Sequence, residues 1–580
     1  MSCFSLRARV EEHLRQIYGA RETQELEAIT DRLLSAMGLR AEAPCLGQGV
    51  EQPSQWSAAD AYLISYGDSI YREGEKPLHS LYRFLKQELD GVVSAVHLLP
   101  FFPYTSDDGF AVMDFTSVNQ TLGDWEDIEA IAGDFVLMAD LVINHISSRS
   151  AWFENFQAGV DPGRDYFICR DPAEDLSRVV RPRASELLRE VQTVAGPRHV
   201  WCTFGPDQVD LDFSNPELLV EFARIVHLYL QRGVRVFRLD AIAFLWKQVG
   251  SDCLHRPQTH EIVRLLRTLV LHAEPAALLV TETNVPSREN LSYFGNGNEA
   301  HMVYNFPLPP LLLHTLYAGD CHALSEWLMS MPAPPLGSTY FNFIASHDGI
   351  GLRPVEGILS ELERDRMVAM VEQLGGRVSV RKLEGRVVPY ELNISLFDAL
   401  SASYQGSDPW QQARFLCAHC LMLALQGVPA FYIHSLLATP NDYERLLHTG
   451  NARSINRHRW SADRLAEALE NSQSPQRQVL EAMRSLLAIR RQQPALHPNA
   501  SQYVLQLGSE VFGVWRQSLG QHQTLFALTN VTDRVQCVSL HSVNLDAAVE
   551  WRELLSGVRL APDQASIELQ PYQSVWLSSL

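Results

Sequence analysis

The sequence has no regular cysteine pattern. Its nine cysteines are odd in number and irregular in spacing, so they indicate neither a disulfide framework nor an array of metal ligands. The pair Cys417 and Cys420 forms a CxxC inside an apolar helical pattern, without a second such pair, and we interpret both as core residues. This cysteine usage fits a reducing compartment, so we expect a cytoplasmic protein.

Long apolar segments are missing too. The first residues carry charges every few positions and no apolar core of signal-peptide length, so we expect no cleaved leader. The most apolar later stretch, residues 415–437, contains His419, Gln426 and Pro429. We interpret it as a buried helix followed by a buried strand, and we expect no membrane-spanning segment.

Positive charge is scarce. The chain has 48 Lys and Arg against 68 Asp and Glu, a net charge of −20. This balance argues against nucleic acid and anionic membrane as partners, so any anionic substrate needs a local basic pocket. No glycine-rich phosphate loop of the nucleotide-binding type is present, and no nucleotide is implied.

The sequence does contain a regular alternation of strand and helix patterns. Hydrophobic residues make up 46% of its 580 residues, as in a globular protein of several folding units. Eight short apolar runs read as strands, with helical patterns between most of them: residues 61–66, 95–102, 135–143, 234–240, 277–282, 302–306, 340–345 and 428–433. This α/β pattern predicts a closed (β/α)8 TIM barrel.

Two connections are too long for simple crossovers, and both follow the carboxyl ends of strands, after strands 3 and 7. We interpret them as inserted lobes that wall the mouth of the barrel. After about residue 497, short strand patterns predict a C-terminal all-β domain. The expected division is an N-terminal helical region at 1–55, the barrel at 56–145, 206–348 and 411–496, a B lobe at 146–205, a B′ lobe at 349–410 and the β domain at 497–580.

Polar residues recur where the predicted strands end. They are Asp140, Asn144 and His145 after the third strand, Arg238 and Asp240 at the fourth, Glu282 at the fifth, and His347 and Asp348 after the seventh. Taken by itself, Asp140 is interpreted as a structural residue. Carboxylates at the same end of several barrel strands converge on one mouth, so we predict an active site there.

Three converging carboxylates suit glycoside chemistry. A retaining mechanism uses a nucleophilic carboxylate and a carboxylic acid about 5–5.5 Å apart. Arg238 precedes Asp240 by two positions and shares its strand face, so we expect it to lower the pKa of Asp240 and keep it ionised. Glu282 must instead stay protonated, which requires a less solvated setting or a nearby negative charge.

Four motifs resemble the α-amylase superfamily of retaining α-glucosidic enzymes: DLVINH at 140–145, VFRLDA at 236–241, TET around Glu282, and ASHDGIG at 345–351. The resemblance implies that Asp240 is the nucleophile, Glu282 the general acid/base and Asp348 the stabiliser of the transition state. It also implies that His145 and His347 bind glucose hydroxyls.

Further stretches resemble the sucrose phosphorylase branch: TSDDGF at 105–110, RPR at 181–183, WCTFGPDQVDLD at 201–212 and NARSINRH at 451–458. Such enzymes pass a glucosyl group to phosphate through a covalent intermediate. The resemblance implies that Asp107 and Arg457 clamp the glucose and that Arg183 faces the phosphate. Asn144 stands where calcium-binding relatives have a ligand, but this branch does without the ion, so we expect no metal and no cofactor.

Two departures bear on the acceptor. Sucrose phosphorylases carry an aromatic hydroxyl where this chain has Phe244, and a Val-His pair where it has Thr283-Asn284. These positions are more similar to glucosylglycerate phosphorylases. A glycerate carboxylate needs a cation or backbone donors, and Arg183, Arg353 and Arg445 are unranked candidates. The loop at 435–445, including Asp442, is similar to the acceptor loop of these enzymes, with a purely structural turn as the alternative.

We therefore predict a retaining glucoside phosphorylase that uses a small glucoside and inorganic phosphate, as a monomer or homodimer. Glucosylglycerate is the first candidate substrate and sucrose the second, followed by sucrose 6-phosphate and glucosylglycerol. The alternatives are an α-glucosidase or transglucosylase, and a catalytically inactive binding scaffold. The presence of all three expected carboxylates argues against the scaffold.

Overall fold

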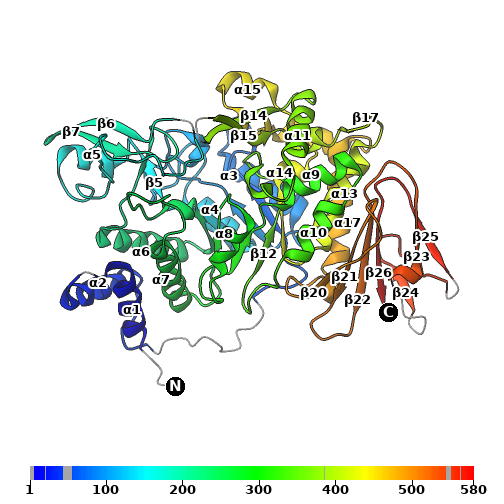
Figure 1. Cartoon of the computed structure of the whole chain (residues 1–580), viewed down its shortest axis with the longest axis horizontal. Coiled ribbons are helices and arrows are strands. Elements are labelled where there is room, and N and C mark those ends of the chain that lie inside the picture. The colour runs from blue at the N-terminus through cyan, green and yellow to red at the C-terminus, as the bar shows by residue number, and fades with distance from the viewer. Residues whose placement is uncertain are drawn as a thin grey trace.

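The computed structural model describes residues 5–19, 21–43, 55–183, 185–383, 386–543, 550–561 and 564–579. At its centre, eight parallel strands close into a barrel (Figure 1). Around the barrel they are β1 (Tyr62–Ser65), β18 (Val428–Tyr432), β12 (Thr339–Asn342), β11 (Met302–Tyr304), β10 (Leu278–Thr281), β9 (Val234–Asp240), β4 (Val136–Val142) and β3 (Ala95–Leu98). The predicted TIM barrel and its eight strands are confirmed.

Helices follow most of the strands. They are α3 (Pro77–Phe84), α4 (Trp125–Asp134), α6 (Pro216–Gln231), α7 (Pro257–Ala273), α9 (Leu308–Ala318), α10 (His322–Ser330), α13 (Gln411–Ala424) and α17 (Pro475–Arg490). Their starts are marked in the sequence: α6 opens with Pro216 behind an Asn215 side chain that caps the Glu217 amide. Cys417 and Cys420 are free and buried in α13.

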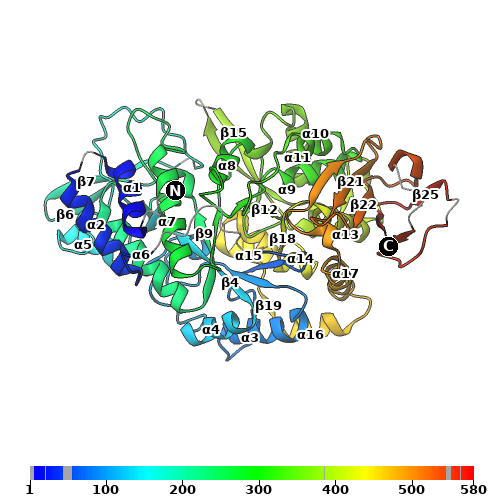
Figure 2. The ribbon, with the colours of Figure 1, turned by 90° about the horizontal axis from the view of Figure 1, so that it is seen from below.

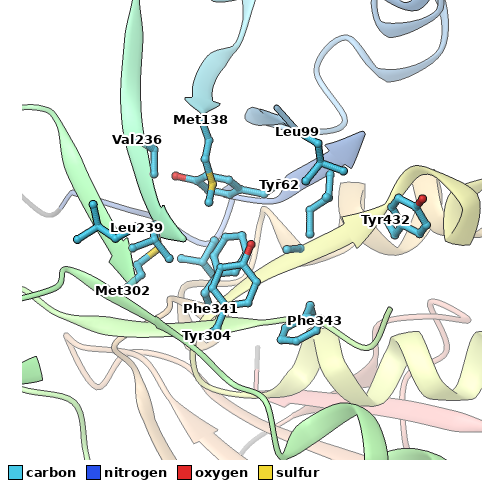
Figure 3. Close-up of a cluster of buried hydrophobic side chains, with 14 of the residues drawn as sticks. Tyr62, Leu99, Met138, Val236, Leu239, Met302, Tyr304, Phe341, Phe343 and Tyr432 are labelled. Carbon is cyan, nitrogen blue, oxygen red and sulfur yellow. The ribbon is translucent and has the colours of Figure 1, made fainter. Parts of the chain in front are cut away.

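Large apolar side chains fill the barrel interior (Figure 3). Tyr62, Met138, Val236, Met302 and Phe341 come from five different strands, and all are buried. The rings of Tyr62 and Phe341 meet edge to face with centroids 5.3 Å apart. Because this packing leaves no channel, substrate can reach inward-facing polar residues only at the end of the barrel.

The first inserted lobe separates β4 from β9. It contains α5 (Ala151–Ala158) and the hairpin of β6 (Leu188–Thr193) with β7 (Gly196–Trp201), at the left of Figure 1. The short strands β5 (His145–Ser147) and β8 (Gln208–Asp210) pair antiparallel where the lobe joins the barrel. This pairing brings polar residues of the lobe beside His145.

The second inserted lobe follows β12 and lies at the top of Figure 1. Its sheet has the order β13 (Ile350–Gly351), β15 (Arg386–Asn393) and β14 (Arg377–Leu383), and α11 (Glu361–Gln373) packs on it. Since β13 begins two residues after Asp348, the first strand of the lobe continues directly from a predicted catalytic carboxylate.

The two ends of the chain lie at opposite ends of the molecule (Figure 2). Helices α1 (Leu6–Tyr18) and α2 (Thr23–Ala36) pack on α7 and α6, with an ion pair between buried His13 and Glu261. At the other end a five-stranded antiparallel sheet has the order β20 (Ser501–Val504), β21 (Val511–Gln517), β22 (Thr524–Asn530), β26 (Ser574–Ser579) and β24 (Trp551–Glu553).

Buried Arg516 fastens this C-terminal sheet to the barrel, and buried Arg490 ties the nearby helix α17 to neighbouring backbone. Arg516 on β21 donates to the backbone carbonyls of Ala424 and His497, at 2.7 Å and 2.9 Å. Arg490 on α17 donates to carbonyls of Leu423 and other residues. Neither arginine has a carboxylate partner among the residues that the structure describes, and burial lowers the pKa of Arg490 to about 10 and that of Arg516 to about 9.

Candidate active site at the carboxyl end of the barrel

Strand β9 points a cation and an anion into the barrel. Side chains alternate along a strand, so Arg238 and Asp240 share the inward face with Val236. Arg238 Nη1 donates a 2.7 Å hydrogen bond to Asp240 Oδ1, and the two residues are only 2% and 6% exposed. The guanidinium carbon lies 5.7 Å and 5.4 Å from the ring centroids of Phe110 and Tyr304. Asp240 is thereby fixed in one orientation.

Asp140 on β4 holds Arg238 from behind. It accepts a hydrogen bond from Arg238 through Oδ1 and lies 2.8 Å from His97 Nε2 through Oδ2. Asp140 and His97 are both fully buried. No substrate can reach Asp140, so the prediction that it is structural agrees with its position.

Glu282 follows β10 and lies beside the same guanidinium. Its Oε2 accepts a 3.1 Å hydrogen bond from the backbone amide of Ala241 and lies 3.9 Å from Arg238 Nη2. Ala241 adopts a left-handed φ of 53°, which costs about 1–3 kcal/mol for a residue with a Cβ. The turn that follows Asp240 therefore directs the Ala241 amide at Glu282. It places the carboxyl groups of Asp240 and Glu282 close enough to repel each other.

Burial raises the pKa of both Asp240 and Glu282. Arg238 opposes the rise at Asp240 while repulsion from Glu282 adds to it, and the net pKa is well above the ordinary range. At Glu282, Arg238 again opposes the rise and Asp348 adds to it. Burial thus raises the pKa of both carboxyls, while Arg238 favours the ionised form of Asp240 and the Ala241 amide that of Glu282.

Arg238 is therefore not the largest influence on the pKa of Asp240. Arg238 does favour the ionised form, as predicted from their shared strand face. Arg238 lowers the pKa of Asp240 as expected, but burial raises it by more, so the net pKa lies above the ordinary range. Residue spacing shows which charges are neighbours but does not show how much water the fold excludes.

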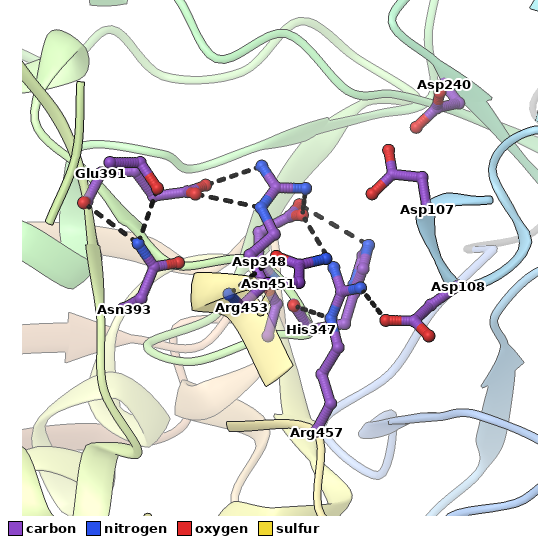
Figure 4. Close-up of polar contacts among 12 residues, drawn as sticks. Asp107, Asp108, Asp240, His347, Asp348, Glu391, Asn393, Asn451, Arg453 and Arg457 are labelled. Carbon is purple, nitrogen blue, oxygen red and sulfur yellow. Dashed lines mark hydrogen bonds and ion pairs between the residues drawn. The ribbon is translucent and has the colours of Figure 1, made fainter. Parts of the chain in front are cut away.

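Asp348 is the third carboxylate at the mouth (Figure 4). Its Oδ1 lies 2.6 Å from Arg453 Nη1 and 3.9 Å from Arg457 Nη2. Burial alone would raise the pKa of Asp348, but Arg453, His347 and Arg238 together hold it well below its usual range. Asp348 is thus an anion at neutral pH, whereas the pKa values of Asp240 and Glu282 are raised.

Both predicted sugar-binding histidines face the pocket as neutral rings. Burial lowers the pKa of His347 to about 3 and also lowers the pKa of His145. His347 stacks on Phe110, with centroids 5.1 Å apart, and His145 Nε2 lies 3.1 Å from the Phe110 carbonyl and 3.2 Å from Gln208 Nε2. A neutral imidazole can accept or donate a hydrogen bond to a hydroxyl.

The two inserted lobes complete the pocket. Its lining comprises Asp107, Phe110, His145, Pro182, Arg183, Phe204, Gln208, Arg238, Asp240, Ala241, Glu282, Asn284, His347, Asp348, Tyr390 and Arg453. The cavity volume of 70 Å³ is far below the roughly 300 Å³ at which small-molecule pockets begin. The pocket is therefore narrow in this structure.

Arg183 best fits the predicted role in binding an anion. It lines the pocket and makes no hydrogen bond or ion pair with any residue in the described part of the chain. Arg445 instead pairs with Asp108 at 3.4 Å, and Arg353 does not line the pocket. Of the three candidate arginines, only Arg183 both lines the cavity and has a guanidinium without a hydrogen-bond or ion-pair partner among the described residues.

Three predicted substrate-binding residues lie outside the pocket wall. Phe244 packs edge to face behind Phe204, with centroids 5.3 Å apart. Asp442 caps the Arg445 amide at the start of α15 (Tyr443–Thr449) and bonds His458 Nδ1 at 2.7 Å, which supports the structural alternative for its loop. These side chains are already committed to protein contacts.

Arg457 is the third of them. It pairs with Asp108, and its Nε donates a 2.8 Å hydrogen bond to the His347 carbonyl. Asp107 and Asp108 both adopt left-handed φ angles, 55° and 48°, which turn neighbouring carboxylates to different sides. Asp107 lines the pocket, while Asp108 holds Arg457 at its edge.

Lys247 occupies the space beside Asn144. Its ammonium lies 2.7 Å from Asn144 Oδ1 and 2.7 Å from Asp210 Oδ2, and it also bonds the Phe244 carbonyl. A metal ion there would need these same three oxygens, so the residues do not fit one. No group of three or more metal-ligating side chains occurs among the described residues.

A second cavity, of 270 Å³, lies beside β20. Its wall includes Asn305, Tyr340, Gln426 and Asn499, whose polar atoms bond other protein groups. Although it is larger, it contains no carboxylate or cation. The candidate catalytic carboxylates line the smaller cavity instead.

Comparison with known proteins places this geometry in a family. Residues 87–333 match the family model described as "Alpha amylase, catalytic domain". A glucosylglycerate phosphorylase from Allomeiothermus silvanus is 44% identical over 99% of this chain and 98% of its own length. The chain belongs to the α-amylase superfamily. A sucrose phosphorylase from Agrobacterium vitis is 30% identical over 75% of this chain and 88% of that protein, so the predicted branch is confirmed as well.

A solved structure of the same branch shares the fold. The crystal structure of a sucrose 6F-phosphate phosphorylase from Thermoanaerobacter thermosaccharolyticum matches with a TM-score of 0.71 at 22% identity, covering 84% of this chain and 96% of that one. In the described part of this superfamily member, no helix has the length and apolarity to span a membrane.

Sequence reasoning missed several residues of this site. Arg453 lies four residues before Arg457 in the same NARSINRH stretch, and Phe204 and Gln208 lie in WCTFGPDQVDLD. Both stretches carry the resemblance to the sucrose phosphorylase branch, but local sequence does not show which of their side chains face the pocket. Tyr390 had no signal, because a strand of an inserted lobe carries no motif that points to a distant pocket.

Proposed function

We propose that this chain is a retaining glucoside phosphorylase that transfers a glucosyl group between glucosylglycerate and phosphate. The observation that carries the proposal is one pocket lined by Asp240, Glu282 and Asp348 together with the uncommitted cation Arg183. Full-length similarity at 44% identity to a protein named glucosylglycerate phosphorylase supports the acceptor.

In the first half-reaction Asp240 attacks C1 of the glucosyl group. The bond from C1 to the glycerate oxygen breaks as Glu282 gives its proton to that oxygen, and an ester joins C1 to Asp240. These roles need charge on Asp240 and a proton on Glu282; the 2.7 Å hydrogen bond from Arg238 supports the first, and the raised pKa of buried Glu282 supports the second. Asp348 stays anionic and accepts hydrogen bonds from sugar hydroxyls as positive charge develops at C1.

In the second half-reaction phosphate replaces glycerate on the same side of the sugar. Glu282, now a carboxylate, accepts the proton of the attacking phosphate while the C1–Asp240 ester breaks, giving α-glucose 1-phosphate with retained configuration. Arg183 binds the phosphate oxygens through its planar fork. A local cation thus admits an anion to a protein of net charge −20.

The glucosyl group itself lies among residues at the closed end of the pocket. Neutral His145 and His347 bind its hydroxyls, and Asp107 accepts from another. Burial raises the pKa of Asp107, but Arg453, Arg457 and Arg183 outweigh this and keep it ionised. Arg457 acts at the edge of this group, with Asp108 and the His347 carbonyl fixing its guanidinium.

Asn284 is the residue we assign to the acceptor. It lines the pocket, and its buried Oδ1 has no hydrogen-bond partner among the described residues. A glycerate hydroxyl would satisfy that oxygen. Phe244 shapes this side only indirectly, by supporting Phe204.

We also propose a cytoplasmic location, supported by the free state of the cysteines that the structure describes. The oligomeric state, monomer or homodimer, is a question for a sizing measurement in solution.

The test of the activity compares two donors with and without phosphate. The protein is incubated with glucosylglycerate and, separately, with sucrose, and glucose 1-phosphate and free glucose are measured. The proposal predicts phosphate-dependent glucose 1-phosphate from glucosylglycerate at a higher kcat/KM than from sucrose. Free glucose alone, at a rate unaffected by phosphate, would show a hydrolase instead.

A further inference from the structure

Glu391 is a buried carboxylate that the mechanism above does not use. It is 1% exposed, lies on β15 in the inserted lobe 349–410, and does not line the pocket. In the antiparallel pairing of β13 with β15 it stands opposite Gly351, three residues after Asp348. A charge is buried so completely only where a partner compensates it.

That partner is Arg453, whose remaining guanidinium nitrogen, Nη1, contacts Asp348 (Figure 4). Arg453 Nε and Nη2 donate to the two oxygens of Glu391 at 3.0 Å and 2.8 Å, the two-pronged geometry that fixes a guanidinium plane. Arg453 Nη1 then lies 2.6 Å from Asp348 Oδ1. One guanidinium therefore bridges a carboxylate of the lobe and a carboxylate of the pocket.

The backbone around Asp348 is fitted to this carboxylate. A Cβ on Gly349 would lie 2.5 Å from Glu391 Cγ and 2.6 Å from the Leu392 carbonyl, so only glycine fits there. The chain leaving Asp348 runs directly against the Glu391 side chain. The position of Glu391 is thus set by the same turn that places Asp348.

We propose that Glu391 is a positioning residue that fixes the Arg453 guanidinium against Asp348 and so couples the inserted lobe to glucosyl transfer. The inference rests on the proposed function only in taking Asp348 as a carboxylate that binds the reacting sugar. Arg453 lines the pocket, so its position also sets the space and charge beside the glucosyl group.

Charge compensation is the second part of the role. Arg453 faces two carboxylates, and its attraction already lowers the pKa of Asp348 and opposes the rise at Glu282. Without the charge of Glu391, more of the Arg453 field acts on Glu282. Glu282 would then lose its proton at a lower pH, and a general acid that has lost its proton cannot assist departure of the leaving group.

The alternative is that the Glu391–Arg453 pair merely braces the fold. A brace would change stability when broken but would leave the pH dependence of the reaction unmoved. The Glu391→Gln substitution keeps the shape and removes the charge, and Glu391→Asp keeps the charge and shortens the reach. Glu356→Gln is the matched control, because Glu356 pairs with Arg381 at 2.7 Å in the same lobe but away from Asp348.

The first assay uses α-glucosyl fluoride as donor. Asp240 forms its bond to C1 while the C1–F bond breaks and fluoride leaves with the electron pair, so neither glycerate nor phosphate is needed for this step. We expect Glu391→Gln to lower kcat/KM for fluoride release by about 10- to 100-fold, Glu391→Asp to lie between it and the wild type, and Glu356→Gln to be unchanged.

The second assay measures the pH profile of kcat/KM for glucose 1-phosphate formation. We expect the alkaline limb of Glu391→Gln to move to lower pH, with Glu356→Gln and wild type superimposed. Unchanged fluoride release and an unmoved limb in a folded Glu391→Gln protein would overturn the proposal. If that variant does not fold, Glu391→Asp decides: fluoride release equal to wild type would overturn it, and a partial loss would support it.

The two proposals fail in different ways. If the wild type releases fluoride but makes no glucose 1-phosphate, the phosphorylase function is wrong, and the fluoride arm still tests Glu391. If the wild type releases no fluoride, glucosyl transfer itself is contradicted, whatever the variants do.

Discussion

The buried arginines at the mouth of the barrel differ from those beside the C-terminal sheet. Arg238 and Arg453 face carboxylates, and although burial opposes it, those carboxylates raise the pKa of both guanidinium groups. Arg490 and Arg516 face backbone carbonyls, and burial lowers their pKa to about 10 and about 9. Arg238, Arg490 and Arg516 are buried and the Arg453 side chain is only 15% exposed, yet their surroundings have opposite electrostatic character.

The difference separates an arrangement of charges that can react from one that only holds the chain. At the mouth, one guanidinium serves two carboxylates in each case, Asp140 with Asp240 for Arg238 and Asp348 with Glu391 for Arg453. The carboxylates exceed the cations locally, so a proton can be shared and moved. Beside the C-terminal sheet, Arg490 and Arg516 form no ion pair with any described residue, and they donate hydrogen bonds to backbone carbonyls.

The largest expected effect comes from removing the nucleophile at the mouth. Asp240→Asn keeps the shape of the side chain but cannot form the ester with C1, so we expect glucose 1-phosphate formation to fall by at least about 1000-fold. Thermal unfolding should show a folded protein, because the amide oxygen can still accept from Arg238. Retention of substantial turnover by this variant would refute the assignment.

Next in size is the effect of Glu282→Gln, which depends on the leaving group. With glucosylglycerate we expect kcat/KM to fall by about 100- to 10000-fold, since the departing oxygen no longer receives a proton. Release of the first fluoride from α-glucosyl fluoride should be affected much less, because fluoride leaves without one. Equal losses with both donors would contradict the role of Glu282 as acid.

The pH profile of the wild type tests the coupled pair. The raised pKa of Glu282 means that kcat/KM should persist above the ordinary titration range of a carboxyl and fall only as pH rises through the raised value. Glu282→Gln should abolish this alkaline limb. A limb that survives in that variant would belong to another group.

Among the stability effects, that of Lys247→Met, beside Asn144 at the edge of the site, should be the largest. It leaves fully buried Asp210 without its ammonium, and losing one partner of a buried pair costs about 3–5 kcal/mol. Chemical denaturation should show the loss in free energy of unfolding. A variant as stable as wild type would show that the contacts of Asp210 with Thr203 and Asn144 compensate its charge without the ammonium.

The smallest effect should be that of Arg516→Met, which removes a buried arginine far from the catalytic carboxylates and should lower only the free energy of unfolding. It leaves backbone carbonyls such as that of Ala424 unpaired, at a cost of about 1–3 kcal/mol in free energy of unfolding. The folded enzyme should keep its kcat/KM, because no catalytic carboxylate is involved. A large loss of activity at unchanged stability would erase the distinction between the two sets of arginines.

The barrel and its three carboxylates were predictable because they depend on local patterns. Strand periodicity located β9, and the two-residue spacing of Arg238 and Asp240 predicted their shared face. The net pKa of Asp240 and the Glu391–Arg453–Asp348 bridge were not predictable. Both depend on how two lobes, separated by many residues, fold over the mouth and exclude water, and no local spacing contains that information.

The central claim, a covalent glucosyl intermediate on Asp240, can be tested most directly by mass spectrometry. Glu282→Gln protein would be incubated briefly with α-glucosyl fluoride, quenched with acid and digested, and its peptides would be mapped. The account predicts one added glucosyl group on Asp240, because glucosylation needs no acid with this donor while breakdown of the ester lacks its base. A glucosyl group on another residue, or fluoride release without any adduct, would contradict it.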